Sequence, residues 1–336
     1  MGALANSFEI PSHLNAKMPI EWTRGRRDQV GMMVLHARSG KTIHTQFRQL
    51  ADFLQSGDLL LFNNSRTIPA VLKGADVEIR LSRKREDELW EAILLTNKEE
   101  GHQDFVLEGN LHCKIVGKGS EEPLQVLSFS KEGGDFFDHL YRFGQPIRYE
   151  YIDSPWPLDY YQTVFASAPG SVEMPSAGRA FSWEMLKGLK EKGVQTEFLQ
   201  LHAGLSYYEN NQWPNPKHHP EAFQIPRLTA QRINETKANG GRIVAVGTTV
   251  VRAVESAVND YGKVCPGKGL TTLYIQQDYE RKIVDGLITG FHEPQASHLH
   301  LLTSFVEESS LILAYQEALG HGYLWHEFGD MNLILP

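Results

Sequence analysis

Residues 242–252 place an apolar run, a glycine and a helix-forming stretch in direct succession, and this feature constrains the fold most. The run Ile243–Val246 predicts a strand that is covered on both faces, as strands of parallel sheets are. Gly247 permits a sharp turn and lets a ligand approach the backbone closely. The residues Val250–Val258 predict a helix directly after the turn. The segment is therefore typical of an α/β fold.

The same turn predicts an anion site. Thr248 or Thr249 is expected to cap the helix, whose first free N–H groups and positive dipole end favour a carboxylate or phosphate. Arg252 follows about one helical turn later, close enough to add a bidentate charge. An ordinary strand–turn–helix unit that binds no ligand explains the segment equally well.

The rest of the chain after residue 160 also alternates between strands and helices, which indicates a barrel-like or mixed α/β sheet. Before it, a helical run with Phe47, Leu50, Phe53 and Leu54, which ends at Ser56-Gly57, is expected to lead into a strand over Asp58–Phe62. The later expected strands are Val194–Leu201, Leu273–Gln276 and Ile283–Ile288, and the expected helices are Ser182–Lys190, Thr229–Ala238, Ser297–Val306 and Ser310–Leu319.

The pattern changes between residues 73 and 151, where short alternating runs are separated by charged or glycine-containing turns. This spacing is typical of an all-β, Greek-key-like module that one helix closes over Asp135–Phe143. We therefore expect a large barrel-like α/β domain, residues 1–72 plus 152–336, with a smaller β-rich domain, residues 73–151, inserted into it. A chain of 336 residues exceeds the usual size of one core, which agrees with two domains.

Composition limits the function classes. Hydrophobic residues make up 41% of the chain, and no apolar stretch approaches the roughly 20 residues that cross a bilayer. Two cysteines, Cys113 and Cys265, without a secretory pattern at Met1–Ile10 favour the cytoplasm. A net charge of −8 argues against broad nonspecific binding of nucleic acid, although it allows a local basic groove. We expect a monomer.

Polar clusters at expected strand ends are the candidates for chemistry, since ligands of α/β sheets gather there. Each cluster also has a structural explanation, as a hydrogen-bonded turn, a loop or a satisfied core histidine. The candidates from position alone are Asn63, Arg66, Ser176, Gly178, His202, His219, Glu221 and His292. His202, and the loop that holds His219 and Glu221, suit acid/base work near neutral pH.

Metal binding is not expected, although the chain has 14 histidines. His298 and His300 would share a face only on a strand, whereas their segment predicts a helix. Standard zinc, phosphate-loop, dinucleotide and serine-hydrolase motifs are missing from the sequence.

The chain resembles the S-adenosylmethionine:tRNA ribosyltransferase-isomerase family of queuosine biosynthesis along nearly its whole length. The segments that carry the resemblance include GDLLLFNNSRTIPAVL, PGSVEMPSAGRAF, HHPEAFQIP, RIVAVGTTVVRAVESA, VDGLITGFHEP and FGDMNLIL. The resemblance implies a large α/β domain with an inserted β-rich domain. It also adds Asp330 to the residues expected to bind the co-substrate.

By resemblance, the reaction moves the ribosyl part of S-adenosylmethionine onto a 7-aminomethyl-7-deazaguanine at the wobble position of tRNA, and adenine and methionine leave. The sulfonium makes the C5′ proton acidic, so the site needs a base, an acid for adenine and a dry cavity. His202 or His219 with Glu221 are the expected acid/base groups, and His292 matches the family too. Asn63, Arg66 and the turn Gly247–Arg252 are expected to hold the donor.

The chain departs from the family at several loops, where Asn64 replaces an aspartate, Ala180 a histidine and Gly290 an asparagine. Such losses remove hydrogen-bonding groups that apolar side chains cannot replace. Two alternatives therefore stay open: a divergent enzyme that uses the same donor on a small-molecule acceptor, and a paralogue that binds without turnover.

Overall fold

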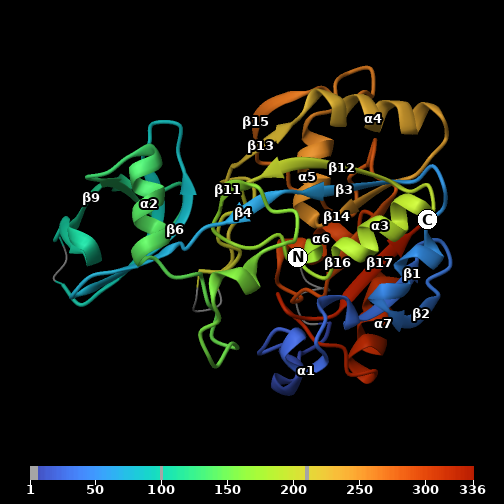
Figure 1. Ribbon diagram of the computed structural model, residues 1–336, viewed down its shortest axis with the longest axis horizontal. Coiled ribbons are helices and arrows are strands. Elements are labelled where there is room, and N and C mark those ends of the chain that lie inside the picture. The colour runs from blue at the N-terminus through green and yellow to red at the C-terminus, as the bar shows by residue number, and fades with distance from the viewer. Residues whose placement is uncertain (1–6, 99–100, 209–211) are drawn as a thin grey trace.

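The computed structural model describes residues 7–98, 101–208 and 212–336, which form a nine-stranded and a six-stranded sheet side by side (Figure 1). A third sheet has only two strands, β4 (Ser65–Thr67) and β11 (Ala168–Ser171). The six-stranded sheet and its helix α2 (Gly133–Phe143) lie at one end of the elongated molecule, and the nine-stranded sheet with the other helices fills the rest. The larger sheet has the order β15 (Gly267–Thr271), β13 (Glu221–Ile225), β12 (Gln195–Leu201), β3 (Leu59–Asn63), β14 (Ile243–Val246), β16 (Gly286–Gly290), β17 (Met331–Leu335), β1 (Gly31–His36) and β2 (Thr42–Gln46).

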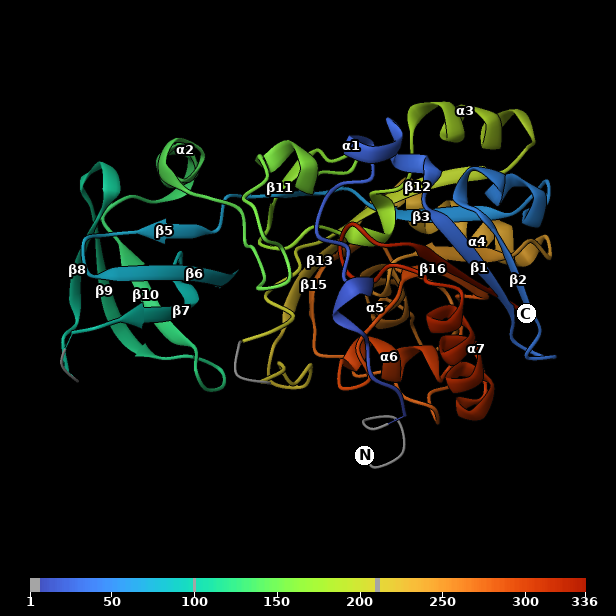
Figure 2. The same cartoon turned by 90° about the horizontal axis from the view of Figure 1, so that it is seen from below.

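Helices cover both faces of the larger sheet, as its continuous apolar runs require. Successive side chains of a strand point to opposite faces, so Leu59 and Leu61 join one core cluster and Leu60 and Phe62 another. The first cluster takes in α4 (Arg227–Ala238), α5 (Thr248–Ser256), α6 (Ser297–Leu302) and α7 (Glu308–Gly320), while α3 (Trp183–Glu191) packs on the other face (Figure 2).

Four neighbouring strands at the centre of this sheet are parallel: β12 pairs with β3, β3 with β14 and β14 with β16. Their carboxyl ends therefore meet at one edge. The residues that follow them, after Leu201, Val246 and Gly290, form the loops at that edge. This is where an α/β sheet binds ligands.

The smaller sheet is all antiparallel, with the order β5 (Val71–Lys73), β6 (Val77–Lys84), β7 (Trp90–Thr96), β10 (Gln125–Phe129), β9 (Leu111–Lys118) and β8 (Asp104–Leu107). Strands β8, β9 and β10 form a meander, and β7 pairs with β10, so these four strands have the order of a Greek key. A bridge between Gly74 and Leu107 brings the sheet close to a closed barrel. The predicted fold class is thus confirmed. Strand β5 runs across the expected domain boundary between residues 72 and 73.

Helix α2 packs on this sheet, and the core beneath it includes residues from outside the segment that forms the sheet. Val172, Leu205 and Tyr208 come from loops later in the chain but belong to the core cluster of the smaller sheet. No helix of the described residues has both the length and the apolar character that a membrane crossing needs.

Two local predictions were wrong. Neither Thr248 nor Thr249 caps α5, because Gly247, with φ of 101°, occupies the N-cap position and no side chain caps the helix. Leu273–Gln276 is irregular, and the strand of that region is β15, which ends at Thr271.

In the larger sheet, the strands β1, β2, β13 and β17 were not predicted at all. The five-residue strand β13 begins at Glu221, inside what reads as a proline-rich loop. It is a strand because it pairs with β12 on one side and β15 on the other.

Candidate active site

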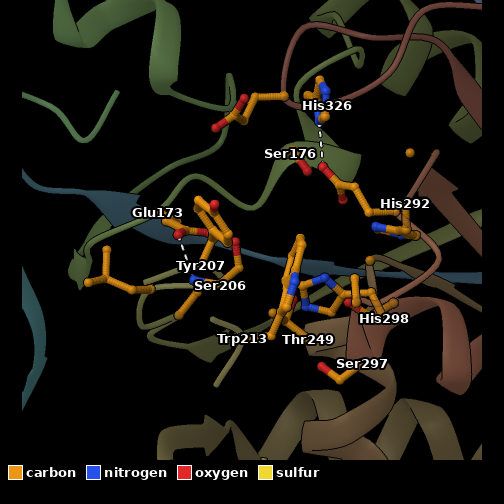
Figure 3. A pocket seen from close by; sticks show the side chains of 18 of the residues that line it. Glu173, Ser176, Ser206, Tyr207, Trp213, Thr249, His292, Ser297, His298 and His326 are labelled. Atoms are coloured by element: carbon orange, nitrogen blue, oxygen red, sulfur yellow. Dashed lines mark hydrogen bonds and ion pairs between the residues drawn. The ribbon is translucent and has the colours of Figure 1, made fainter. Parts of the chain in front are cut away.

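One cavity of about 590 Å³ lies at the edge where the four parallel strands end (Figure 3). Its walls come from the loops after β12, β14 and β16, from residues 149–151 at the junction with the smaller sheet, and from residues 173–177 and 326–327. A volume of this size suits a nucleoside-sized ligand.

The structure brings most of the predicted residues together in this cavity, although they are far apart in the sequence. Those that line it are Ser176, His219, Glu221, Gly247, Thr248, Thr249, Arg252 and His292. The other five, Asn63, Arg66, Gly178, His202 and Asp330, are not among the lining residues.

Asn63 and His202 form hydrogen bonds with residues at the edge of the sheet, outside the cavity lining. The Asn63 side-chain oxygen accepts hydrogen bonds from the backbone of Ser65 and Leu201, each at 3.0 Å, and its amide donates to the Leu201 carbonyl at 2.8 Å. His202 Nδ1 lies 2.7 Å from the Ser65 hydroxyl, and burial lowers the pKa of the imidazole. The Asn63 side chain is therefore satisfied by the protein itself, and His202 has a partner at Nδ1.

The other three residues outside the cavity also have structural partners. Arg66 is exposed, with its guanidinium 5.9 Å from the centre of the Tyr141 ring. Gly178 is buried against Phe165, where a side chain would not fit. Asp330 accepts hydrogen bonds from two backbone N–H groups, those of residues 31 and 324, and burial raises its pKa.

The N-terminus of α5 lies on the cavity wall, but the charge of Arg252 is not available to a ligand there. That guanidinium forms an ion pair with Glu221, and its Nε donates to the Leu273 carbonyl at 2.9 Å. The side chains of the pair are only 12% and 9% exposed, so the two charges largely neutralise one another inside the wall. The helix end and the hydroxyl of Thr249 remain for a ligand's anionic group.

His219 connects the cavity to the smaller sheet. Its Nδ1 lies 3.1 Å from the Tyr208 hydroxyl, and that hydroxyl donates to Glu121 Oε1 at 3.0 Å. A tyrosine hydroxyl has one hydrogen, so it can only accept from His219, which places the imidazole hydrogen on Nδ1. Nε2 then has a free lone pair; it faces Gly204 and has no hydrogen-bond partner among the described residues.

His292, in the segment after β16, and His298, in the first turn of α6, also line the cavity (Figure 3). Their rings are 5.1 Å apart, and His292 Nε2 lies 2.7 Å from the Thr289 hydroxyl. Burial lowers the pKa of His292 to about 3 and lowers that of His298 as well. Both imidazoles are therefore neutral at physiological pH, so each can accept or donate a hydrogen bond.

The sequence did not single out Glu173, which the structure places on the cavity wall. Its Oε1 accepts a hydrogen bond from the Ser206 N–H at 2.7 Å and another from the Tyr149 hydroxyl. Burial raises the pKa of this carboxyl to about 7. A carboxyl with such a pKa is a candidate acid/base group.

Two further acidic side chains line the same cavity. Glu327 accepts a hydrogen bond from Tyr151, and burial raises its pKa. Glu293 is paired with His326 at 2.9 Å. The cavity thus has an acidic region near residues 149–151 in addition to the anion-binding end at α5.

Aromatic rings lie next to the acidic region. The centres of the Tyr149 and Tyr207 rings are 6.0 Å apart, and those of Tyr207 and Trp213 are 5.0 Å apart. All three residues line the cavity. Such a wall offers flat faces on which a nucleobase can stack.

The positions at which the chain departs from the family are divided between the cavity and the core. Gly290 lines the cavity, whereas Ala180 is buried in the core cluster on the α3 side of the sheet. Asn64 donates to the Ser167 hydroxyl at 3.1 Å, and it too lies outside the lining. A histidine lost at position 180 therefore removes no group from the cavity wall of this chain.

One group of side chains in the described parts of the chain has donors of the kind that bind metals, and it lies away from the cavity. His44, Glu317 and His321 have potential ligand atoms within 4.8 Å of one another. The two imidazole rings are stacked, with centres 3.9 Å apart and planes 18° apart, so their nitrogen lone pairs do not converge on one point. The absence of a metal from the reaction stays a prediction.

Comparisons with known proteins cover nearly the whole chain. Residues 5–334 match the family described as "Queuosine biosynthesis protein". The chain is 37% identical to the S-adenosylmethionine:tRNA ribosyltransferase-isomerase of Thermus thermophilus, with 99% of both chains covered, and 34% identical to that of Thermotoga maritima, with 98% of both covered. A crystal structure of the S-adenosylmethionine tRNA ribosyltransferase from Thermotoga maritima superposes with a TM-score of 0.55 at 28% identity and covers 98% of this chain and 99% of that one. The chain belongs to the queuosine biosynthesis protein family.

Proposed function

We propose that this protein transfers and isomerises the ribosyl moiety of S-adenosylmethionine onto a 7-aminomethyl-7-deazaguanine of tRNA, giving epoxyqueuosine with release of adenine and methionine. The observation that carries this proposal is the end-to-end similarity to enzymes that bear the name of this reaction. The cavity supports it, since it combines an anion-binding end, neutral histidines and an aromatic wall.

The donor's methionine carboxylate fits the N-terminus of α5. Gly247 leaves the backbone N–H groups accessible, and the helix dipole favours a negative charge there. The Thr249 hydroxyl adds a hydrogen-bond donor, and the Asn63 amide lies 3.5 Å behind it. Asn63 thus supports the donor site through Thr249 and does not contact the donor itself.

The two proton transfers fall to neutral histidines of the cavity lining. A neutral imidazole can take the C5′ proton, and the imidazolium that forms can give this proton to the departing adenine. His219 and His292 are both neutral in this cavity, because burial lowers the pKa of each. Glu221 does not serve as a free base in this scheme, because its carboxylate is engaged by Arg252 and by the Gly204 N–H at 3.1 Å.

Adenine release tests the proposal against its two alternatives. The protein is incubated with S-adenosylmethionine in three mixtures. One contains tRNA with the aminomethyl base, the second contains unmodified tRNA, and the third contains no RNA. Release only with the modified tRNA supports the proposed reaction. Release without RNA would support a small-molecule acceptor, and binding without release would support a paralogue that does not turn over.

The location of Ala180 in the core favours the enzyme over the non-catalytic paralogue. The replacement of the family histidine at this position was one of the departures that led us to expect lost chemistry, yet the position does not line the cavity. The expectations of a monomer and of a cytoplasmic location stay predictions, which gel filtration and cell fractionation would test.

A further inference from the structure

Glu173 has no role in the scheme above, although its carboxyl lies on the cavity wall (Figure 3). Two hydrogen bonds, from the Ser206 N–H and the Tyr149 hydroxyl, fix its Oε1. The groups that act most strongly on this carboxyl are uncharged donors and one like charge, Glu327. A buried carboxylate without a strong cationic neighbour is costly, so the arrangement suits a ligand that brings the positive charge.

The neighbours of Glu173 indicate which ligand that is. Ser206, whose backbone N–H holds the carboxyl, directly precedes Tyr207, whose ring lies between those of Tyr149 and Trp213. A base stacked on this aromatic wall would present its exocyclic groups to the carboxyl. The anion-binding turn that suits the donor's carboxylate comes from a different element, the N-terminus of α5.

We propose that Glu173 binds the aminomethyl group of the acceptor base and removes its proton. This inference rests on the proposed function. The group is an ammonium ion at neutral pH and has no lone pair with which to attack the ribosyl carbon. Transfer of one proton from nitrogen to a Glu173 carboxylate oxygen breaks an N–H bond, forms an O–H bond and leaves a neutral amine. The charges of both partners disappear together, which a dry cavity favours.

The pH dependence of this step has a defined sign. Glu173 must be ionised to accept the proton, and burial raises its pKa to about 7, so kcat/KM should fall as the pH drops below that value. The other titratable groups that face it are Tyr149, whose pKa burial raises well above 10, and Glu327, whose pKa burial also raises. Glu327 lies beside His326. The variant E327Q distinguishes the effect of Glu327 on the pH profile from that of Glu173.

The test compares adenine release with modified tRNA in the wild type, E173Q, E173D, Y149F and E327Q between pH 5.5 and 9.5. We expect E173Q to lose about 100-fold in kcat at pH 7, the size of a typical acid/base contribution. Its remaining rate should rise with pH, because the amine then loses its proton to solvent. E173D should recover part of the rate. Y149F removes a donor to the ionised carboxyl and should move the acidic limb to higher pH. E327Q removes a like charge that raises the pKa of Glu173, so it should retain an acidic limb and move it to lower pH.

Two controls separate a chemical role from a structural one. Calorimetry should show S-adenosylmethionine binding within about twofold of wild type in E173Q, since the donor occupies the α5 end. E191Q, an exposed substitution on α3, should leave the rate and the pH profile unchanged. An unchanged rate and profile in E173Q, alongside an active wild type, would overturn this inference alone. A wild type that releases no adenine would overturn the proposed function and this inference with it.

A second measurement does not depend on activity. A carboxyl whose folded-state pKa is raised stabilises the protein at low pH, and this contribution is lost as the pH rises from about 4.5 to about 7. E173Q cannot ionise, so its melting temperature relative to wild type should be higher at pH 8 than at pH 5. The same difference at both pH values would contradict the assignment of a raised pKa to Glu173.

Discussion

Removing the charge of Glu221 should destabilise the protein much more than removing the charge of an exposed glutamate. The Glu221 carboxylate is paired with Arg252 in the cavity wall, where the two side chains are only 9% and 12% exposed. In E221Q the guanidinium stays buried without its counterion. It keeps its carbonyl partners, Leu273 and Thr271, at 2.9 and 3.4 Å.

The size of the effect follows from the burial. Breaking a buried pair costs about 3–5 kcal/mol, and the two carbonyl acceptors favour the lower end, about 3 kcal/mol. The unfolding entropy of a chain this long is about 0.7 kcal/mol per degree. We therefore expect E221Q to lower the melting temperature by about 4 °C. Replacing both members, in E221Q/R252M, should recover most of this loss, because no unpaired charge remains.

Differential scanning calorimetry at pH 7 measures these shifts. The matched control is E235Q, which breaks the exposed pair between Arg232 and Glu235 on α4, with side chains 47% and 45% exposed. That change should move the melting temperature by less than 1 °C. The reasoning fails if E221Q melts within 1 °C of wild type, or if the double variant is as unstable as the sum of its single variants.

Three further predictions concern the candidate site. In Y208F the acceptor for His219 Nδ1–H is lost, so nitrogen NMR should show a mixture of imidazole tautomers where the wild type shows only the Nδ1–H form; a mixture in both would refute the tautomer assignment. T249V removes one hydroxyl from the donor site and should weaken S-adenosylmethionine binding about fivefold by calorimetry, an effect of about 1 kcal/mol; wild-type affinity would place the donor elsewhere. The affinity for tRNA should fall steeply between 50 and 200 mM salt, because phosphate contacts release counterions; a flat response would remove tRNA as the partner.

The sequence predicted the parts of the fold whose signals are local. The run Ile243–Val246 forms a strand because its residues are apolar on both faces, and Gly247 turns the chain because it tolerates a positive φ. Strand β13 could not be predicted this way. It begins in a proline-rich loop, and two partners from distant parts of the chain make it a strand.

The same distinction applies to the site. His219 and His292 were predicted from their expected loop positions and from the family resemblance, and both line the cavity. The sequence gives no sign that Arg252 is neutralised by Glu221. Glu173 stands among ordinary loop residues. Its raised pKa arises from burial beside Tyr149, which only the folded chain provides.

The shared core beneath the smaller sheet limits how these proteins can be recombined. Val172, Leu205 and Tyr208 fill that core from outside the segment that forms the sheet. A chimaera that exchanged residues 71–150 alone between two relatives would pack the sheet's core residues from one parent against these three side chains from the other. Exchanges that include the three residues together with the segment should yield the better-expressed hybrids.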